Sequence, residues 1–513
     1  MRSTIRTFLV AILLPLAVVG CDNLTGVTDL NDNPTQATSM EPALQFANLP
    51  LAIVPNRYEA WRANLIHAEC IVQHVASTFT AWSGCRYTRN AAYMSAHWDV
   101  QWTVVRNIED VLAKTNPEDN PQLTNIHAMT QILRVYFMQR MTDLYGNIPY
   151  EQAGKGLTED VQNPEYNSVE EIYPAMIADL QAARGLLDPN VSAIDPAQDL
   201  LFSGDVAKWR RFANSLILRI GMRMSEVAPG QAQSAVEDAI SDGVMESNDD
   251  IAYTIHAESN GDRYGVGEVF NDFPSGGHGF HISQTFMDVL KGDAGVSNVV
   301  DPRTSIFAAQ YTDTDELVSD NPVDLQGLQN GLLEDELPDD RFDFAQPNRA
   351  YMVRYDSPAL WMSFAEVKFL LAEAALRGWG ASGAQQHYEE GIEAAMKHLT
   401  IYGAPEIADA DIQTYLSSLP DRDPTLEEVI EQKWIALFLN GYEAWAELRR
   451  TGYPDEINPV DYPGNITNGE IPSRLEYPNS ESFVNGANYE AGATDPNQMS
   501  TRLWWAIEGN ASI

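Results

Sequence analysis

The chain has 513 residues, a formal net charge of −41 and a hydrophobic fraction of 44%. This hydrophobic fraction, together with 11 Trp, 21 Tyr and 17 Phe, excludes wholesale disorder and is sufficient for a large core. The strong negative charge would repel nucleic acid phosphates, so nucleic-acid binding is excluded as a function.

The N-terminus has the pattern of an export signal. Residues 1–20 begin with two arginines and continue with the apolar run Phe8–Val19. At ~1.5 Å per residue this run is too short to cross a ~30 Å hydrocarbon core as a helix, so it is interpreted as part of a signal peptide. The small residues before Cys21 are similar to a bacterial lipobox and predict lipidation of Cys21. The alternative is a plain secretory signal followed by a chance cysteine.

The polar segment 21–40 is predicted to tether the lipid to the folded body. No later segment is apolar enough to span a bilayer, so the acyl chains would be the attachment to the membrane.

Residues 41–513 are predicted to form a single, mainly helical domain. Apolar side chains at spacings of three and four indicate amphipathic helices in two stretches, 41–242 and 363–451. In the first stretch the clearest stripes lie within 126–144, 168–187 and 205–225. Helix pairs joined by short loops favour tetratricopeptide-like packing, although no clean 34-residue repeat is present.

Helix-end signals are clearest in the second stretch. Ser363 begins a capping box and Gly378 is a plausible stop. Pro424 is predicted at a first helical position, followed by an apolar stripe from Leu426 to Trp445. By contrast, residues 243–360 and 452–513 are rich in Gly, Asp, Asn and Pro, which predicts loops and short strands laid over the helical body.

Two further cysteines, Cys70 and Cys85, could form a disulfide in an exported protein, and the alternative is two buried thiols. His67, Cys70 and His74 could share a helix face, but their spacing matches no standard zinc motif, so ordinary packing is favoured. No metal ion and no cofactor is predicted.

The sequence contains no Gly-x-Ser-x-Gly elbow, no His-Glu-x-x-His and no Walker loop, so no enzymatic activity is predicted. Acidic pairs suited to a glycosidase are expected by chance in a chain with 73 acidic residues. The acidic segments Asp313–Glu316 and Asp339–Asp340 offer oxygen ligands for Ca²⁺ but lack EF-hand spacing, which favours solvated loops.

Several sequence strings, taken in order, resemble the SusD/RagB family of outer-membrane lipoproteins, in its SusD-like branch. They are DLNDNPT (29–35), TDLYGNIPY (142–150), KWRRFANSLILR (208–219), EVKFLLAEAALRGW (366–379), QKWIALFLNGYEAWAELRRTGYP (432–454), IPSRLEYP (471–478) and LWW (503–505). The resemblance implies four tetratricopeptide-like helix pairs carrying an irregular half. It also implies a partner, a SusC-like TonB-dependent outer-membrane barrel, to which the lipoprotein presents a glycan or sometimes a peptide.

Most of these strings are interpreted as structural. Gly146 is suited to a left-handed helix cap, and Pro149 prevents the helix from continuing. Asp143 is expected to cap a helix or pair with an arginine. Arg449 and Arg450 are expected to neutralise carboxylates such as Glu443 and Glu447 and to bond helix-end carbonyls.

Sugar binding requires flat apolar faces for pyranose rings and forked polar groups for hydroxyls. The best cluster lies in an early loop, and the resemblance adds contacts on the irregular half. The predicted ligand-binding residues are Phe79, Trp82, Arg86, Tyr87, Asn90, Tyr93, Tyr264, Phe273, His278 and Phe280. Trp98 and Trp102, at helical spacing, are expected to pack instead.

The favoured function is therefore capture of a nutrient, most simply an oligosaccharide, at the cell exterior. Two alternatives stay open: a helical-repeat envelope adaptor that binds no small ligand, and a lipid-anchored hydrolase.

Overall fold

The computed structural model describes residues 40–191, 194–258, 262–272, 278–511 and 513. The predicted signal peptide, Cys21 and nearly all of the predicted tether lie outside the described residues, as does Phe273. Buried apolar side chains form one large cluster whose members run from Ala43 to Trp505, so a common core extends along the described chain.

Helices make up most of both stretches that the apolar periodicity marks. The first contains α2 (Pro42–Ile53), α3 (Arg57–Glu59), the π-helical segment η1 (Ala60–Glu69), α4 (Ala91–Met94), α5 (Ala96–Lys114), α6 (Thr124–Tyr145), α7 (Val169–Leu186), α8 (Val206–Arg223) and α9 (Pro229–Asp242). The second contains α14 (Phe364–Arg377), α15 (Ala384–Lys397), α16 (Asp409–Leu416), α17 (Leu426–Ala436) and α18 (Gly441–Thr451). The mainly helical fold class is confirmed.

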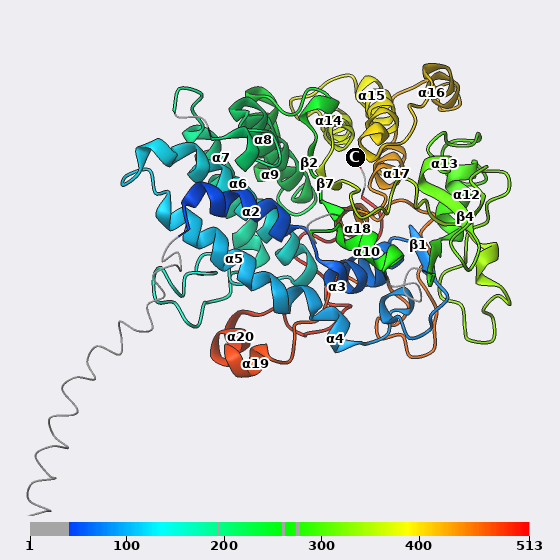
Figure 1. Ribbon diagram of the computed structural model, residues 1–513, viewed down its shortest axis with the longest axis horizontal. Helices are drawn as coiled ribbons and strands as arrows, with labels where there is room; N and C mark the ends of the chain where they lie inside the picture. Colours follow the sequence, from blue (N-terminus) through cyan, green and yellow to red (C-terminus); the bar gives the residue numbers. More distant parts are fainter. Residues whose placement is uncertain (1–39, 192–193, 259–261, 273–277, 512) are drawn as a thin grey trace, which may run out of the picture.

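Neighbouring helices pack in pairs, α6 on α7, α8 on α9 and α14 on α15, and α14 joins the two stretches by packing on α8. Figure 1 shows α5 to α9 on one side of the molecule and the short elements α12, α13 and β4 on the other, with α10, α17 and α18 between them. No helix among the described residues has the length and apolar character needed to cross a membrane.

Local signals explain several helix ends. Ser168 caps α7 in a capping box with Glu171, and the side chain of Asp205 accepts hydrogen bonds from the first backbone amides of α8. Gly378 ends α14 in the left-handed conformation, with φ +70°. Gly146 ends α6 with φ +94° and ψ −129°, a conformation that favours glycine more strictly than the left-handed helical cap expected from the sequence.

The expectation for the helix after Pro424 was wrong in two respects. Thr425 forms a capping box with Glu428, so α17 begins at Leu426 rather than at Pro424. The apolar stripe is also divided between two helices, α17 and α18, because Leu439 adopts φ +68° between them. At the start of α18, a Cβ on Gly441 would lie 2.7 Å from Glu69 Oε1, so the close approach of η1 requires glycine there.

The irregular segment and the C-terminal tail carry short elements, as the composition predicts. They are α10 (Gly265–Asn271), α12 (Gln284–Lys291), α13 (Thr304–Phe307), α19 (Glu481–Val484) and α20 (Gly486–Gly492). Three small antiparallel sheets pair β1 (Val75–Ser77) with β3 (Phe280–Ile282), β2 (Ala252–Thr254) with β7 (Ala359–Met362), and β4 (Ala308–Tyr311) with both β5 (Leu317–Ser319) and β6 (Gln346–Pro347). The β1–β3 pair, with Val75 opposite Ile282, ties the early loop to the irregular segment.

The family-like strings meet in a buried network of charged side chains. Arg223 on α8 donates to both carboxylate oxygens of Glu443 at 2.7 Å and to Glu447 at 2.5 Å. Arg450 donates to Glu447 and to Glu373 on α14, each at 2.7 Å. The 432–454 string therefore supplies Glu443, Glu447 and Arg450 to this network, the 366–379 string supplies Glu373, and Arg223 follows the 208–219 string on α8. The predicted pairing of Arg450 with Glu447 is confirmed.

Electrostatics within this network favour ionised carboxylates despite burial. Burial alone would raise the pKa of Glu447, but Arg450, Lys433 and Arg223 outweigh it and hold that pKa well below its ordinary value. Arg449 plays a different part, because it donates to the backbone carbonyls of Trp445, Asp143 and Ser473 and its burial lowers its pKa to about 9.

Candidate functional site

The early loop is fastened to the helical body by a disulfide. Cys70, at the end of η1, is bonded to Cys85 in the short helix η2 (Ser83–Arg86), which settles the open alternative in favour of the disulfide. Between them the chain packs closely on η1, since a Cβ on Gly84 would lie 2.1 Å from the carbonyl oxygen of Ile66. The 15-residue separation encloses Phe79 and Trp82, two of the predicted ligand contacts.

Trp82 is a support for the loop rather than an exposed platform. Its ring stacks on Phe280 of β3 with centroids 4.1 Å apart and meets Phe79 edge-on at 4.8 Å. Trp82 is 5% exposed and Phe280 is fully buried, so Phe280 has no surface for a ligand in this conformation. Gly279 permits the stack, because a Cβ there would lie 2.2 Å from the Phe79 ring.

Four aromatic side chains in front of this support form a surface that we term the aromatic strip: Tyr58, Trp61, Phe79 and Tyr93. Tyr58 is exposed and the other three are partly buried. The rings of Trp61 and Tyr93 lie 5.7 Å apart, and Trp61 contacts Trp82 edge-on at 6.1 Å.

Two arginines lie against the aromatic strip. The guanidinium of Arg62 sits 5.4 to 5.5 Å from the ring centroids of Tyr58, Trp61 and Tyr93. Arg341 sits 5.6 Å from Phe79. Such cation–π contacts fix the orientation of the rings.

Asn90 acts on the strip indirectly. Its side-chain oxygen caps α4 by accepting a hydrogen bond from the Tyr93 amide at 3.2 Å, and so positions Tyr93. The sequence interpretation missed Tyr58 and Trp61, because they lie at helical spacing outside the glycine-containing loop. Their i, i+3 aromatic pair just before that loop was the available signal.

Arg86 and Tyr87 are buried, contrary to the prediction that they contact ligand directly. Arg86 has no exposed surface and donates to the carbonyl oxygens of Ser77 (3.2 Å), Phe79 (2.9 Å) and Leu332 (3.2 Å). Burial lowers its pKa, in part offset by Tyr462, whose ring lies 5.4 Å away. Arg86 therefore joins two backbone segments, the early loop at Ser77 and Phe79 and the segment around Leu332.

Tyr87 is fully buried in a left-handed conformation at φ +54°. Its carbonyl oxygen accepts a hydrogen bond from the Ile466 amide at 2.9 Å. It thus joins the early loop to the C-terminal tail, and the same correction applies to it as to Arg86.

His278 is held by an acidic loop. Its Nε2 lies 2.8 Å from Asp315 Oδ1, and Asp315 also pairs with Arg349. Asp340 caps a short helix by accepting from the Phe342 amide. These two loops were the Ca²⁺ candidates, and within the described residues no group of three or more His, Cys, Asp or Glu is placed to hold a metal ion.

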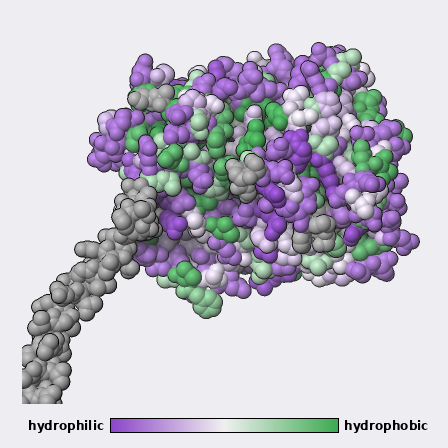
Figure 2. Space-filling model, in the orientation of Figure 1, coloured by the Kyte–Doolittle hydropathy of each residue, from purple (hydrophilic) through white to green (hydrophobic). Residues whose placement is uncertain are grey.

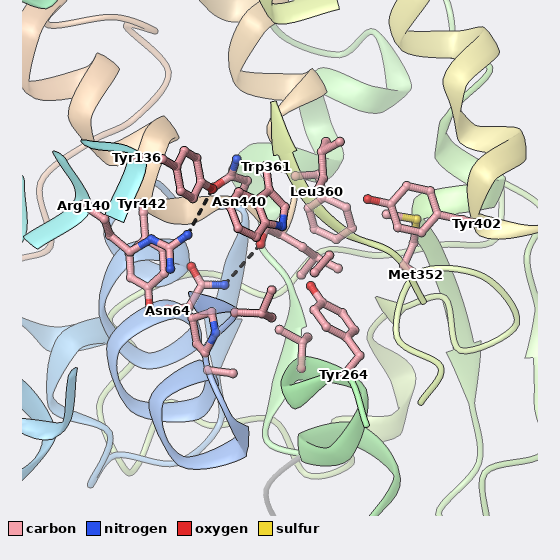
Figure 3. Close-up of a pocket in the computed structure, with 17 residues that line it drawn as sticks. Asn64, Tyr136, Arg140, Tyr264, Met352, Leu360, Trp361, Tyr402, Asn440 and Tyr442 are labelled. Atoms are coloured by element: carbon pink, nitrogen blue, oxygen red, sulfur yellow. Dashed lines mark hydrogen bonds between the residues drawn. The ribbon is translucent and has the colours of Figure 1, made fainter. Parts of the chain in front are cut away.

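Tyr264 lies in the interior. It lines a cavity of about 50 Å³ at the junction of helices and irregular segment, and Figure 3 shows it facing the space that Tyr402 and Asn64 also border. In the same view Asn64 donates to the carbonyl oxygen of Leu439 at 3.2 Å, and Arg140 to the Tyr136 hydroxyl at 3.1 Å. The cavity is too small for a sugar, so Tyr264 is not a ligand contact in this conformation.

A large polar cleft adjoins the aromatic strip. Its volume is about 1020 Å³, and its walls come from the start of α12, from residues 329–336 and from the tail residues 456–463. Five carboxamide side chains line it: Gln73, Gln284, Gln329, Asn330 and Asn458. The ring of Tyr462 and the side chains of Val460 and Leu333 add apolar surface.

The strip and the cleft share one wall. Thr80 Oγ1, next to Phe79, donates to Glu334 at 2.6 Å. Asn330 Nδ2 donates to the carbonyl oxygen of Val75 at 2.9 Å. With the Arg86 bond to Leu332, these contacts hold the loop 330–334 between the aromatic faces and the cleft.

A second hollow lies elsewhere on the molecule, beside α5 and α19. Trp98 is 2% exposed, meets Trp102 edge-on at 4.9 Å and donates to Glu481 at 3.1 Å, which confirms that it packs. Next to it Phe483 is 86% exposed. Figure 2 shows a mainly hydrophilic face with apolar atoms at the lower edge, where Figure 1 places α19 and α20.

The fold is mainly helical, and the aromatic strip and the polar cleft lie where the early loop meets the irregular segment and the tail. A family profile described as "Starch-binding associating with outer membrane" matches residues 34–478. The chain belongs to this SusD-like family, a family of non-catalytic binding proteins associated with the outer membrane.

Solved structures agree with this assignment. One named as a chitin-binding protein is 30% identical, with 91% of this chain and 100% of that chain covered and a TM-score of 0.79. Another, named Bacteroidetes AC2a SusD-like, is 28% identical over the same shares, also at 0.79. A chitin-binding SusD homologue from Flavobacterium johnsoniae is 25% identical, with 91% of this chain and 98% of that chain covered and a TM-score of 0.74. No curated protein matches the chain.

Proposed function

We propose that this protein is a lipid-anchored cell-surface protein that binds an oligosaccharide and delivers it to a SusC-like TonB-dependent transporter. The observation that carries the proposal is the aromatic strip beside a carboxamide-lined cleft, on a member of a glycan-binding, outer-membrane family. Aromatic faces suit the C–H side of sugar rings, and carboxamides both donate to and accept from hydroxyl groups.

The ligand class to test first is an N-acetylglucosamine oligosaccharide. Two of the similar structures are named as chitin-binding. Carboxamide side chains also complement the acetamido group, which offers one N–H donor and one carbonyl acceptor. A starch oligosaccharide is the comparison, because the family description names starch.

Trp61→Ala is expected to weaken oligosaccharide binding about tenfold, since truncating a central aromatic contact commonly costs more than ~1 kcal/mol of binding free energy. Isothermal titration of the purified protein with N-acetylglucosamine hexamer measures the effect. Trp61 is preferable to Trp82, whose removal would also collapse the stack on Phe280.

Trp102→Ala is the matched control, because Trp102 is a partly buried tryptophan that lines the other hollow. It should leave the affinity unchanged. Full-strength binding by Trp61→Ala, with unchanged melting temperature, would remove the aromatic strip as the site.

Cys21→Ser is expected to release the protein from membranes, because Cys21 would be the acceptor of the acyl chains. Fractionation and metabolic labelling with a fatty acid follow the change in the native host. Co-purification of a plug-and-barrel receptor with the wild-type protein tests the partner. An unlabelled wild-type protein, freely soluble in the periplasm, would contradict the anchoring proposal.

A further inference from the structure

The polar cleft carries negative charge that the protein itself does not neutralise. Four carboxylates line it: Asp288, Glu336, Glu456 and Asp461. No Lys, Arg or His lines the cleft, and within the described part of the chain none of these four carboxylates forms an ion pair. Lys291, one turn beyond Asp288, is occupied by the carbonyl oxygen of Leu325 at 3.2 Å.

Further carboxylates lie near the lining residues, and at Asp288 burial and the Asp293 carboxylate outweigh the opposing effects of Gln284 and Lys291 on the pKa. Burial, and then the neighbouring carboxylate of Asp293, raises the pKa of Asp288. Burial, followed by Asp455 and Glu456, raises the pKa of Glu427 behind the tail wall. The aromatic strip differs, because Arg62 and Arg341 lie against its rings.

The cleft is also richer in hydrogen-bond acceptors than in donors. Carboxylates only accept, and the Thr285 hydroxyl is already used, since it donates to Gln73 at 2.7 Å. Among the described residues, Asn330 Oδ1 and Glu456 Oε2 have no donor within hydrogen-bond distance. A ligand that complements this lining brings N–H and O–H donors and no negative charge.

The spacing of the carboxylates argues against a metal ion as the complement. They come from α12, from the loop 329–336 and from the tail, and the described residues contain no cluster of three or more groups placed to hold a metal. Negative charge distributed along a cleft of about 1020 Å³ complements a chain-like ligand with several positively charged groups better than it complements a single metal ion.

We propose that the cleft selects oligosaccharides that carry free, protonated amines, such as deacetylated N-acetylglucosamine chains, and rejects sugars that carry carboxylate groups. The proposal rests on the proposed function, that this face binds oligosaccharides, and adds the charge class of the ligand. An ammonium group offers three donors and no acceptor, which is the complement of the cleft lining. The neutral acetylated chain remains a weaker ligand through the aromatic strip and the carboxamides.

The test compares three hexasaccharides by isothermal titration of the full mature chain at pH 5.5: glucosamine, N-acetylglucosamine and galacturonic acid. In 20 mM NaCl the glucosamine hexamer should bind at least tenfold more tightly than the acetylated one, and the galacturonic acid hexamer should not bind. In 200 mM NaCl the advantage should shrink, because salt screens interactions between exposed charges.

A charge-neutralising double variant, Glu456→Gln with Asp461→Asn, separates the cleft from the overall negative charge. It should lose most of the preference for glucosamine, measured as the ratio of its affinities for the glucosamine and N-acetylglucosamine hexamers. The matched control, Glu118→Gln with Asp119→Asn, makes the same charge change in an exposed loop after α5 and should keep the preference.

The outcomes separate the two proposals. Equal affinity of the wild-type protein for the glucosamine and N-acetylglucosamine hexamers overturns the charge selection alone. So does an equal loss of the preference for glucosamine in both double variants. Absence of binding by all three hexamers overturns the oligosaccharide function as well. Tighter binding of the galacturonic acid hexamer would overturn the assigned charge class directly.

Discussion

Arg223→Met is expected to lower the free energy of unfolding by about 3–5 kcal/mol, the usual cost of removing one partner from a buried ion pair. Arg223 is fully buried and contacts both Glu443 and Glu447. The methionine would fill part of the volume but leave two carboxylates with less positive charge around them. Urea unfolding followed by far-ultraviolet circular dichroism measures the loss.

Arg422→Met is the control for this experiment, since the Arg422 side chain is exposed to solvent in its pair with Glu428. Exposed pairs contribute little, so this variant should unfold at the wild-type urea concentration. An Arg223 variant as stable as the control would mean that the network is not stabilising.

The pH dependence follows from the same charges. The pKa of Glu447 is held below its ordinary value in the folded state, so its contribution is present above the unfolded pKa of about 4.3 and is lost as the pH falls below it. The stability difference between wild type and Arg223→Met should therefore narrow in acid.

Removal of the disulfide, by Cys70→Ala with Cys85→Ala, is expected to lower the free energy of unfolding by about 3 kcal/mol, the loop-entropy value for a loop of this length. The bond spans 15 residues and both cysteines are buried. The double alanine variant avoids leaving a single reactive thiol. Urea unfolding with and without dithiothreitol measures the effect.

Reductant provides the internal control for the disulfide. It should shift the wild-type midpoint toward that of the variant and leave the variant itself unchanged. Oligosaccharide affinity should fall in parallel, because the enclosed loop carries Phe79 and its support Trp82. A variant with wild-type stability in the absence of reductant would show that packing alone holds the loop.

Much of the fold could be predicted from the sequence, because helix ends and amphipathic faces are encoded locally. Ser363 caps α14 and Gly378 ends it, as expected. The break at Leu439 was not visible, since the apolar stripe continues through it. Just after that break, Glu69 of η1 approaches Gly441 so closely that a Cβ there would lie 2.7 Å from Glu69 Oε1, a tertiary contact that the local pattern does not encode.

The sequence indicated which loop belongs to the candidate site, but it did not indicate the role of each residue in that loop. Composition led to the loop around Trp82, because aromatic side chains and glycine gather there. The sequence does not distinguish an aromatic ring that faces solvent from a buried ring that packs behind it. Trp82 and Phe280 are buried and stack on each other. Arg86 was predicted to bind the hydroxyl groups of a sugar, yet its guanidinium donates to the backbone carbonyls of Ser77 and Phe79 in its own loop and of Leu332, which only the tertiary fold brings close. The cleft was missed because its walls come from three separate parts of the chain.

The brace at Arg86 has a further consequence for how cargo is exchanged. A surface whose backbone is already fixed needs no rearrangement on encounter, so capture should follow a single kinetic phase. Residence time would then depend on how many sugar rings are seated, and short chains would leave soonest. Such rapid exchange would suit the proposed delivery of the oligosaccharide to a transporter, because a site that closes around its ligand would release it more slowly.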